Sequence, residues 1–199
     1  MGRPKEHGEK TRRTLLEAAE RLLAERGIAA VTVRSVADRA GTTTRAVYAL
    51  FGSKEGLVQA LAARGFDLIS ERLDSLPLTG DPLEDFLTAA IAGFRTFAVD
   101  HPHLFRLVFV SGLGIPFGAE TFTAQSTSLR RLGERVERLR ASGRLGGHRV
   151  DDVMLMCDAL CTGLANREVC GLIEPAQADR VWRDALTALV AGLGRAPVG

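Results

Sequence analysis

Three consecutive side chains near residue 44 carry groups that can read the bases of DNA. Thr43, Thr44 and Arg45 directly follow a turn of small residues, Ala40-Gly41-Thr42. An arginine pairs bidentately with guanine, and a threonine meets base edges or the methyl group of thymine. Side chains at the N-terminal end of a recognition helix reach these groups in the major groove. We therefore predict that these three residues read bases.

Four further side chains around them suit contacts with phosphates. Tyr48 lies one helical turn after Thr44, and its hydroxyl can donate to a phosphate oxygen. Lys54 and the unpaired amides of the helix that begins there form a second phosphate clamp. Thr32 and Arg34, at the start of the preceding helix, are predicted to hold the opposite backbone.

Short helices must position these side chains. Apolar spacing predicts one helix from about Thr11 to Arg26, with Gly27 at its C-terminal end. The next three helices are expected to begin after the N-caps Thr32, Thr43 and Ser53, and the small residues between the second and third allow a tight turn. This is the pattern of a helix-turn-helix. A polar turn of this kind is also common as a plain surface connection, so the pattern alone leaves both interpretations open.

The charge distribution favours the DNA-binding interpretation. Residues 1–54 carry eleven Lys and Arg against six Asp and Glu, a net charge of +5, whereas residues 55–199 carry a net charge of −3. A basic module joined to a mildly acidic body is typical of nucleic-acid-binding proteins. We predict a DNA-binding domain over 1–54 and a second domain over 55–199.

The second domain is predicted to be helical throughout, which makes the whole chain all-α. Residues 54–75 suit a long connecting helix, and Asp81-Pro82-Leu83-Glu84 is a strong helix start. Further helices are expected over 103–111, 119–143, 151–171 and 177–193. No strand pattern of useful length is found.

The segment Thr32-Val-Arg-Ser-Val-Ala-Asp-Arg-Ala-Gly41, followed by Tyr48, Phe51, Ser53-Lys54-Glu55 and Leu57, resembles the tetracycline-repressor (TetR) family of bacterial transcriptional regulators. The resemblance covers about residues 10–57. It implies an all-helical homodimer with three N-terminal DNA-binding helices and a larger C-terminal bundle that binds a small molecule and dimerises. It places the family's phosphate contacts on Tyr48 and Lys54. One departure is Leu50, where many members carry His, Tyr or Trp.

A ligand cavity is predicted in the C-terminal bundle, because eight of the nine phenylalanines lie between 66 and 122. Apolar walls with few polar groups describe small-molecule sites. The predicted lining residues are Phe86, Phe94, Phe105, Phe109 and Met154, with Asp158 as a polar anchor. Aromatic residues at helical spacing are more often plain core, and Asp158 in the alternative faces solvent or an arginine.

Other chemistry is not indicated. Cys157 and Cys161 share a helix face and are expected to be small buried apolar groups rather than a thiol sensor. His101 and His103 flank Pro102 without a third ligand pattern, so neither a metal site nor a cofactor is expected. No signal peptide or membrane-spanning run is found, which predicts a cytoplasmic protein without membrane association. The chain has no phosphate-binding glycine loop and no nucleophile motif, and we do not expect an enzyme.

The sequence thus predicts a repressor that binds double-stranded operator DNA as a homodimer and responds to a hydrophobic small-molecule effector. The operator is expected to be nearly palindromic. The helices over 151–171 and 177–193 are expected to pair with those of a second copy, with an internal bundle as the alternative. A DNA-binding activator or constitutive repressor without an effector is the competing hypothesis.

Overall fold

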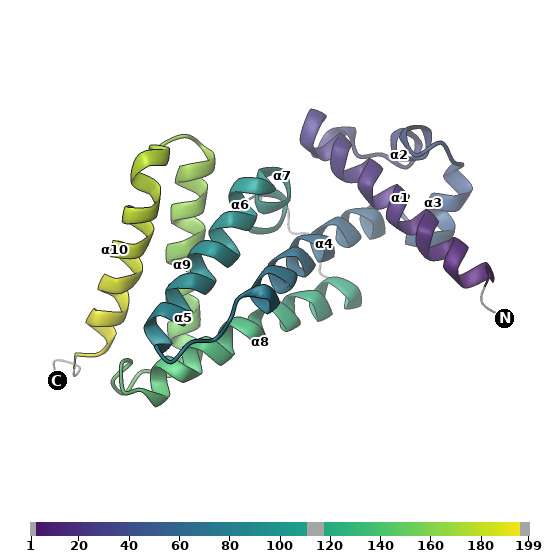
Figure 1. The fold of residues 1–199 in the computed structure, drawn as a ribbon. Helices are drawn as coiled ribbons and strands as arrows, with labels where there is room; N and C mark the ends of the chain where they lie inside the picture. The colour runs from purple at the N-terminus through teal and green to yellow at the C-terminus, as the bar shows by residue number, and fades with distance from the viewer. Residues whose placement is uncertain (1–2, 111–117, 196–199) are drawn as a thin grey trace. The chain divides into compact units, whose positions relative to one another are not determined.

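A computed structural model of the chain describes residues 3–110 and 118–195, and every regular element in those ranges is helical (Figure 1). The elements are α1 (Arg3–Arg26), η1 (Ile28–Ala30), α2 (Val33–Arg39), α3 (Thr44–Phe51), α4 (Lys54–Ser75), α5 (Pro82–Thr88), η2 (Ala89–Arg95), α6 (Thr96–Asp100), α7 (Pro102–Phe105), η3 (Arg106–Val110), α8 (Ala119–Ala141), α9 (Val150–Val169) and α10 (Pro175–Leu193). The predicted all-α fold is confirmed. Among these helices, none is both long and apolar enough to cross a bilayer.

The chain forms two compact units. One combines the residues up to Phe66 with His103–Gln125, and the other combines Asp67–Pro102 with the residues from Ser126 onward. Helices α4 and α8 each contribute residues to both units. These units are defined by packing, so the functional division at residue 54 remains a prediction.

The core of the first unit is built on one face of α1. Small residues at 18, 19 and 37 let the helices approach closely where α1 and α2 meet. The completely or almost completely buried apolar side chains are Leu15, Ala18, Ala19 and Leu22 of α1, Val36 and Ala37 of α2, and Val47 of α3. Burying a Leu or Val side chain contributes roughly 1.5–3 kcal/mol, so this shared face is what holds the three helices together.

Local capping sets where the short helices begin, as the sequence predicts. The Thr32 hydroxyl accepts from the Ser35 amide at 3.1 Å, and the Ser35 hydroxyl in turn accepts from the Thr32 amide, which completes a capping box before α2. The Thr43 hydroxyl accepts from the amide of Ala46 at 3.3 Å. The Ser53 hydroxyl accepts from the Gly56 amide at 3.1 Å at the start of α4.

Two predicted boundaries were wrong. Helix α1 begins at Arg3 and not near Thr11, because nothing in the polar sequence before Thr11 stops a helix. The segment expected as one short helix over 103–111 is a single α-turn, α7, followed by the π-helical turn η3. Residue 111 lies outside the described residues.

In the second unit, α5 begins where the sequence places it, with the Asp81 carboxylate accepting from the Leu83 amide at 2.9 Å. The helix then widens into the π-helical segment η2 before α6, which departs from the expected 3.6-residue spacing. Gly93 of η2 packs so closely on α4 that an added Cβ would lie 2.8 Å from the Leu73 side chain. The absent side chain is what permits this approach.

A charged cluster joins three elements of the second unit. The guanidinium of Arg95 in η2 donates twice to the Glu168 carboxylate of α9, through Nε at 2.8 Å and Nη2 at 2.8 Å. The indole N–H of Trp182 in α10 donates to the same carboxylate at 2.9 Å, while the Trp182 ring is fully buried. Such shared charge-assisted bonds fix the packing of these helices on one another.

Candidate DNA-binding site

Helix α3 has one buried and one exposed face. Val47 is fully buried against the core of the first unit, whereas Thr44, Arg45 and Tyr48 are all exposed. Position 48 follows positions 44 and 45 by four and three residues, so the Tyr48 side chain lies beside those of Thr44 and Arg45 on the helix surface. Tyr48 is 55% exposed, which is a large exposed fraction for an aromatic residue. The structure thus brings three of the predicted contact residues together on a solvent-facing surface.

Thr43 precedes that face and caps α3. Its hydroxyl oxygen accepts the Ala46 amide, while the residue as a whole is exposed. The hydroxyl hydrogen is still available as a donor, because a hydroxyl has one donor and two acceptor positions. Capping and a contact to DNA are therefore compatible at this residue.

Thr32 and Arg34 lie at the N-terminal end of α2. The Thr32 hydroxyl is half-buried in the capping box with Ser35, so its first role is to begin α2. The Arg34 side chain is 90% exposed and its Nε lies 4.0 Å from the Asp38 carboxylate. An exposed pair of this kind contributes little, which leaves the Arg34 guanidinium able to reach a phosphate.

Lys54 is exposed at the first position of α4. The neighbouring Glu55 has its pKa lowered by a bond from its own backbone N–H and by the Ser53 hydroxyl. Gly56 faces the end of α3 so closely that an added Cβ would lie 2.0 Å from the Phe51 carbonyl oxygen. This contact sets the path between α3 and α4, and hence the position of Lys54 relative to Tyr48.

Arg39, at the end of α2, forms an ion pair within the protein. Its Nη1 donates to the Glu25 carboxylate of α1 at 2.9 Å, and Nη2 pairs with the second oxygen. The hydrogen bond from Arg39 lowers the pKa of Glu25. This bidentate pair ties α2 to α1 and was not expected from the sequence, because the two residues are fourteen positions apart.

The six predicted ligand residues are divided between the two units. Phe105 and Phe109 belong to the first, where their rings stack with centroids 5.7 Å apart and Phe109 also meets Phe66 edge-on at 5.8 Å. The other four belong to the second: Phe86 is buried, Phe94 and Met154 are half-buried, and Asp158 is exposed. The surrounding protein partly removes the Asp158 carboxyl group from water, and this desolvation raises its pKa. Their role as a ligand site remains a prediction.

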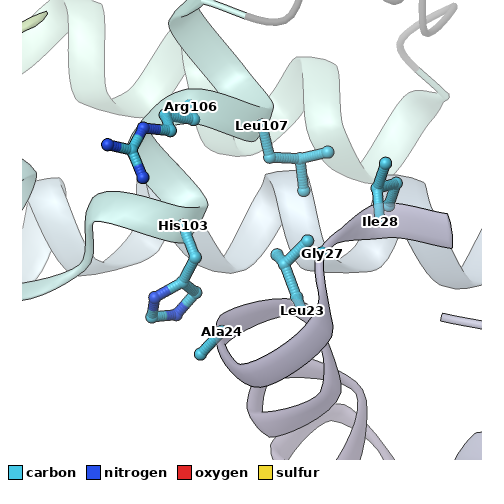
Figure 2. A pocket seen from close by; sticks show the side chains of 7 residues that line it. All are labelled: Leu23, Ala24, Gly27, Ile28, His103, Arg106 and Leu107. Atoms are coloured by element: carbon cyan, nitrogen blue, oxygen red, sulfur yellow. The ribbon is translucent and has the colours of Figure 1, made fainter. Parts of the chain in front are cut away.

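One cavity of the first unit is lined by other residues altogether. Figure 2 shows it between the C-terminal end of α1 and the α7–η3 segment. Its lining includes Leu23, Ile28, His103, Arg106 and Leu107. The sequence gives little sign of this site, because the two segments are some eighty residues apart in the chain.

The two cysteines of α9, Cys157 and Cys161, are shielded from solvent. Cys157 and Cys161 are buried in α9, and Cys170 is exposed. Burial raises the pKa of Cys157 to about 12 and also raises that of Cys161. A thiol sensor needs an accessible thiolate, so the geometry fits the expectation of small buried apolar groups.

The fold and this surface define a helix-turn-helix regulator of the DNA-binding class. Residues 15–61 match the model of bacterial regulatory proteins of the tetR family, and residues 87–189 match the tetracyclin repressor-like C-terminal domain. The chain belongs to the tetR family. The family resemblance found in the sequence is thus confirmed.

Individual relatives match part of the chain. The transcriptional repressor KstR2 of Mycobacterium tuberculosis is 39% identical over 90 residues, 45% of this chain and 44% of KstR2. The transcriptional regulator TtgR of Pseudomonas putida is 42% identical over 81 residues, 41% of this chain and 33% of TtgR. The matched stretch therefore spans less than half of either relative.

The fold extends further than the sequence similarity. A solved structure from Rhodococcus sp. RHA1, described as a protein with unknown function, superposes with a TM-score of 0.80 at 24% identity. The match covers 93% of this chain and 96% of that one. At this identity the likeness shows a shared fold and carries no information about ligand or target.

Proposed function

We propose that the protein is a ligand-responsive transcriptional repressor that binds a near-palindromic operator as a homodimer. The observation that carries the proposal is the polar outer face of α3, where Arg45 and Tyr48 are exposed while Val47 is buried. A helix braced in this way presents its N-terminal side chains to the major groove. Repression, as opposed to activation, is supported by the name of the relative KstR2.

In this proposal the DNA contacts divide into two kinds. Thr43, Thr44 and Arg45 read bases, with the Arg45 guanidinium donating two hydrogen bonds to one guanine. Tyr48, Lys54, Thr32 and Arg34 contact phosphates and set the register of the protein on the duplex. In this proposal residues 1–54 bind DNA, and residues 55–199 bind the ligand and form the dimer.

Exposed apolar side chains near the C-terminus support a homodimer. Leu155 is 70% exposed and Leu172 is 68% exposed, and Met156, which follows Leu155 in the chain, is also exposed. Trp182, Leu186 and Val190 are buried within the chain and hold α10 in its own bundle. We propose that α9 and α10 pair with the same helices of a second copy, which places two α3 helices about one duplex turn, roughly 34 Å, apart.

A hydrophobic effector would act by favouring one spacing of the two α3 helices over another. Helix α4 begins beside α3 and contributes to both units, which makes it the element through which a change in the C-terminal bundle can reach the DNA-binding surface. The effector changes DNA affinity only by the difference in its affinity for the two states.

Selection from random duplex DNA tests the proposal. Purified protein is incubated with a random library, bound DNA is amplified over several rounds, and the enriched sequences are read while light scattering gives the mass of the complex. The proposal expects an inverted repeat bound by two copies. Enrichment of a single half-site by one copy, or no enrichment, would contradict it.

A thermal-shift screen against hydrophobic compounds tests the effector. A compound that raises the melting temperature and weakens binding to the selected DNA supports ligand response. A flat result across a broad library would favour the competing hypothesis of a regulator without an effector.

A further inference from the structure

The C-terminal end of α3 is held by a side chain of α1. The guanidinium of Arg12 lies over the ring of Phe51, 5.3 Å from its centroid, and Phe51 is the last residue of α3. Tyr48 lies three residues before Phe51, and Arg45 lies three residues before Tyr48. Six residues of α-helix span only about 9 Å. A contact that fixes Phe51 therefore also fixes the direction in which Arg45 and Tyr48 point.

Arg12 is in turn held by a residue outside the predicted DNA-binding residues 1–54. Its Nη2 donates to the Glu120 carboxylate of α8 at 2.5 Å, and the Arg12 side chain is 30% exposed. A free arginine side chain samples many rotamers, and a short charge-assisted hydrogen bond restricts them. Glu120 therefore keeps the guanidinium in place over the Phe51 ring.

The first turn of α8, which carries Glu120, is itself fixed to α4. The Thr121 hydroxyl donates to the Gln59 carbonyl at 2.9 Å, and Thr121 is completely buried. At Gly118, just before α8, an added Cβ would lie 2.4 Å from Oε1 of Gln59. All of these residues belong to the first unit. Glu120 is thus a firm attachment point for the Arg12 side chain.

We propose that Arg12 is a positioning residue for DNA reading, and that Glu120 of α8 determines how firmly Arg12 holds α3. Neither side chain needs to touch DNA in this arrangement. The ion pair orders the guanidinium, and the guanidinium orders the end of the helix that carries Arg45 and Tyr48. The inference rests on the proposed DNA-binding function, since it concerns the contacts that α3 makes with DNA.

Substitution of Glu120 separates this role from simple electrostatics by the sign of its effect. Glu120→Gln removes a negative charge, and charge alone would make the protein bind every DNA sequence more tightly. An Arg12 that contacted a phosphate would also be freed by this change. The proposal expects the opposite result, a loss of about threefold to tenfold in operator affinity, because the end of α3 is held less firmly.

Four proteins are titrated by fluorescence anisotropy against the duplex selected from the random library and against a scrambled duplex: wild type, Glu120→Gln, Arg12→Gln and the double variant. The titrations cover a range of salt concentrations at a temperature where melting curves show every protein to be folded. Each single variant is expected to weaken operator binding without changing the salt slope. The double variant should bind no more weakly than Arg12→Gln, because both substitutions break one contact. Glu17→Gln, which alters an exposed carboxylate of α1, is the charge-matched control and should not weaken binding.

A measurement without DNA tests the contact between the helices. In nitrogen–proton spectra of the full chain, Glu120→Gln is expected to shift the backbone amides of Tyr48 and Phe51, although residue 120 lies on another helix. The reason is that the guanidinium over the Phe51 ring loses its anchor. Glu17→Gln is expected to leave these two amides in place.

Unchanged or tighter operator binding by Glu120→Gln would overturn the inference and leave the proposed function intact. So would unmoved α3 amides in that variant, or additive losses in the double variant. A salt slope reduced by about one in Arg12→Gln would make Arg12 a phosphate contact instead. A wild type that binds the selected duplex no tighter than scrambled DNA would reject the proposed function, and this inference with it.

Discussion

The guanidinium of Arg12 in α1 lies over the ring of Phe51, 5.3 Å from its centroid, at the C-terminal end of α3. The same guanidinium donates to the Glu120 carboxylate of α8 at 2.5 Å. A cation over an aromatic face stabilises by about 0.5–1 kcal/mol at an exposed site and more when it is shielded from water. Arg12 thus fixes the end of α3 against the helix that braces it.

Replacing Arg12 by alanine tests this brace. Arg12→Ala is expected to lower the free energy of unfolding by about 1 kcal/mol, because both the ring contact and the ion pair are lost. Urea unfolding followed by circular dichroism measures the change. Arg13→Ala, an exposed neighbour on the same helix, is the control and should shift the unfolding midpoint far less.

The turn between α3 and α4 depends on the missing side chain of Gly56. Gly56→Ala would place a Cβ 2.0 Å from the Phe51 carbonyl oxygen, so the backbone must move. We expect a loss of about 1–3 kcal/mol in stability and weaker DNA binding, since Lys54 and Tyr48 lie on either side of this turn. Gly133→Ala in α8 is the matched control: its Cβ meets nothing within 4 Å, and helix propensity predicts a gain of up to about 1 kcal/mol. Equal changes in stability and DNA binding for the two variants would show that the Gly56 contact has no importance.

Arg45 is expected to determine sequence preference. Arg45→Ala should cost about 1–3 kcal/mol of binding to the selected operator and relax the preference at one base pair. Binding to random DNA should fall much less. Competition assays with operators mutated one base pair at a time measure this, and an unchanged preference profile would remove Arg45 from the set of base-reading residues.

Lys54 is expected to act on all sequences alike. Lys54→Ala should weaken operator and random DNA by the same factor and reduce the slope of log affinity against log salt by about one, since one phosphate contact is lost. A salt titration on both DNAs measures the two effects. Loss of operator binding with random binding intact would instead assign Lys54 a base contact.

Asp85 predicts a pH-dependent contribution to stability. Its side chain is 1% exposed, and this burial alone would raise the pKa of the carboxyl group. The carboxylate accepts hydrogen bonds from the Thr79 amide and hydroxyl, both at 2.7 Å, and from Arg138 at 3.0 Å. These bonds outweigh the effect of burial, so the pKa of Asp85 is lowered overall. A lowered folded-state pKa means stability that is present above the unfolded pKa, about 3.9, and is lost as pH falls through the folded value.

Asp85→Asn is therefore expected to lower the free energy of unfolding by about 2 kcal/mol at pH 7, and by progressively less below pH 4. Urea unfolding at pH 7, 5 and 3.5 measures the difference from wild type. Asp184→Asn, which removes an exposed carboxylate 3.8 Å from Arg180, is the control and should have little effect at any pH. A difference from wild type that stays constant down to pH 3.5 would contradict the assigned role of the Asp85 carboxylate.

Local signals predicted where several helices begin. The caps at Thr32, Thr43 and Asp81 depend on residues only two or three positions away, and all three cap helices in the structure as the sequence predicts. The buried Val47 and exposed Tyr48 follow from helical periodicity. These features could be read from the sequence because each is decided within one or two turns of a helix.

Long-range features could not be predicted in this way. Three features join residues that are far apart in the chain: the Arg39–Glu25 pair, the contact of Arg12 with Phe51, and the cavity between α1 and η3. No periodic pattern in the sequence indicates such contacts. The π-helical segments η2 and η3 were also missed, since an extra residue in a turn follows from packing such as that of Gly93 on Leu73. The start of α1 was misplaced because a polar segment was taken to be non-helical.

Fluorescence anisotropy with the DNA that flanks the protein's own gene tests the central claim most directly. Wild type and the Arg45→Ala variant are titrated against that duplex and a scrambled duplex at two salt concentrations. The account predicts tight, salt-sensitive binding of the wild type to one site in the flanking DNA, with the preference over scrambled DNA reduced in the variant. Binding of the wild type no tighter to any duplex, flanking or selected from the random library, than to scrambled DNA would contradict it.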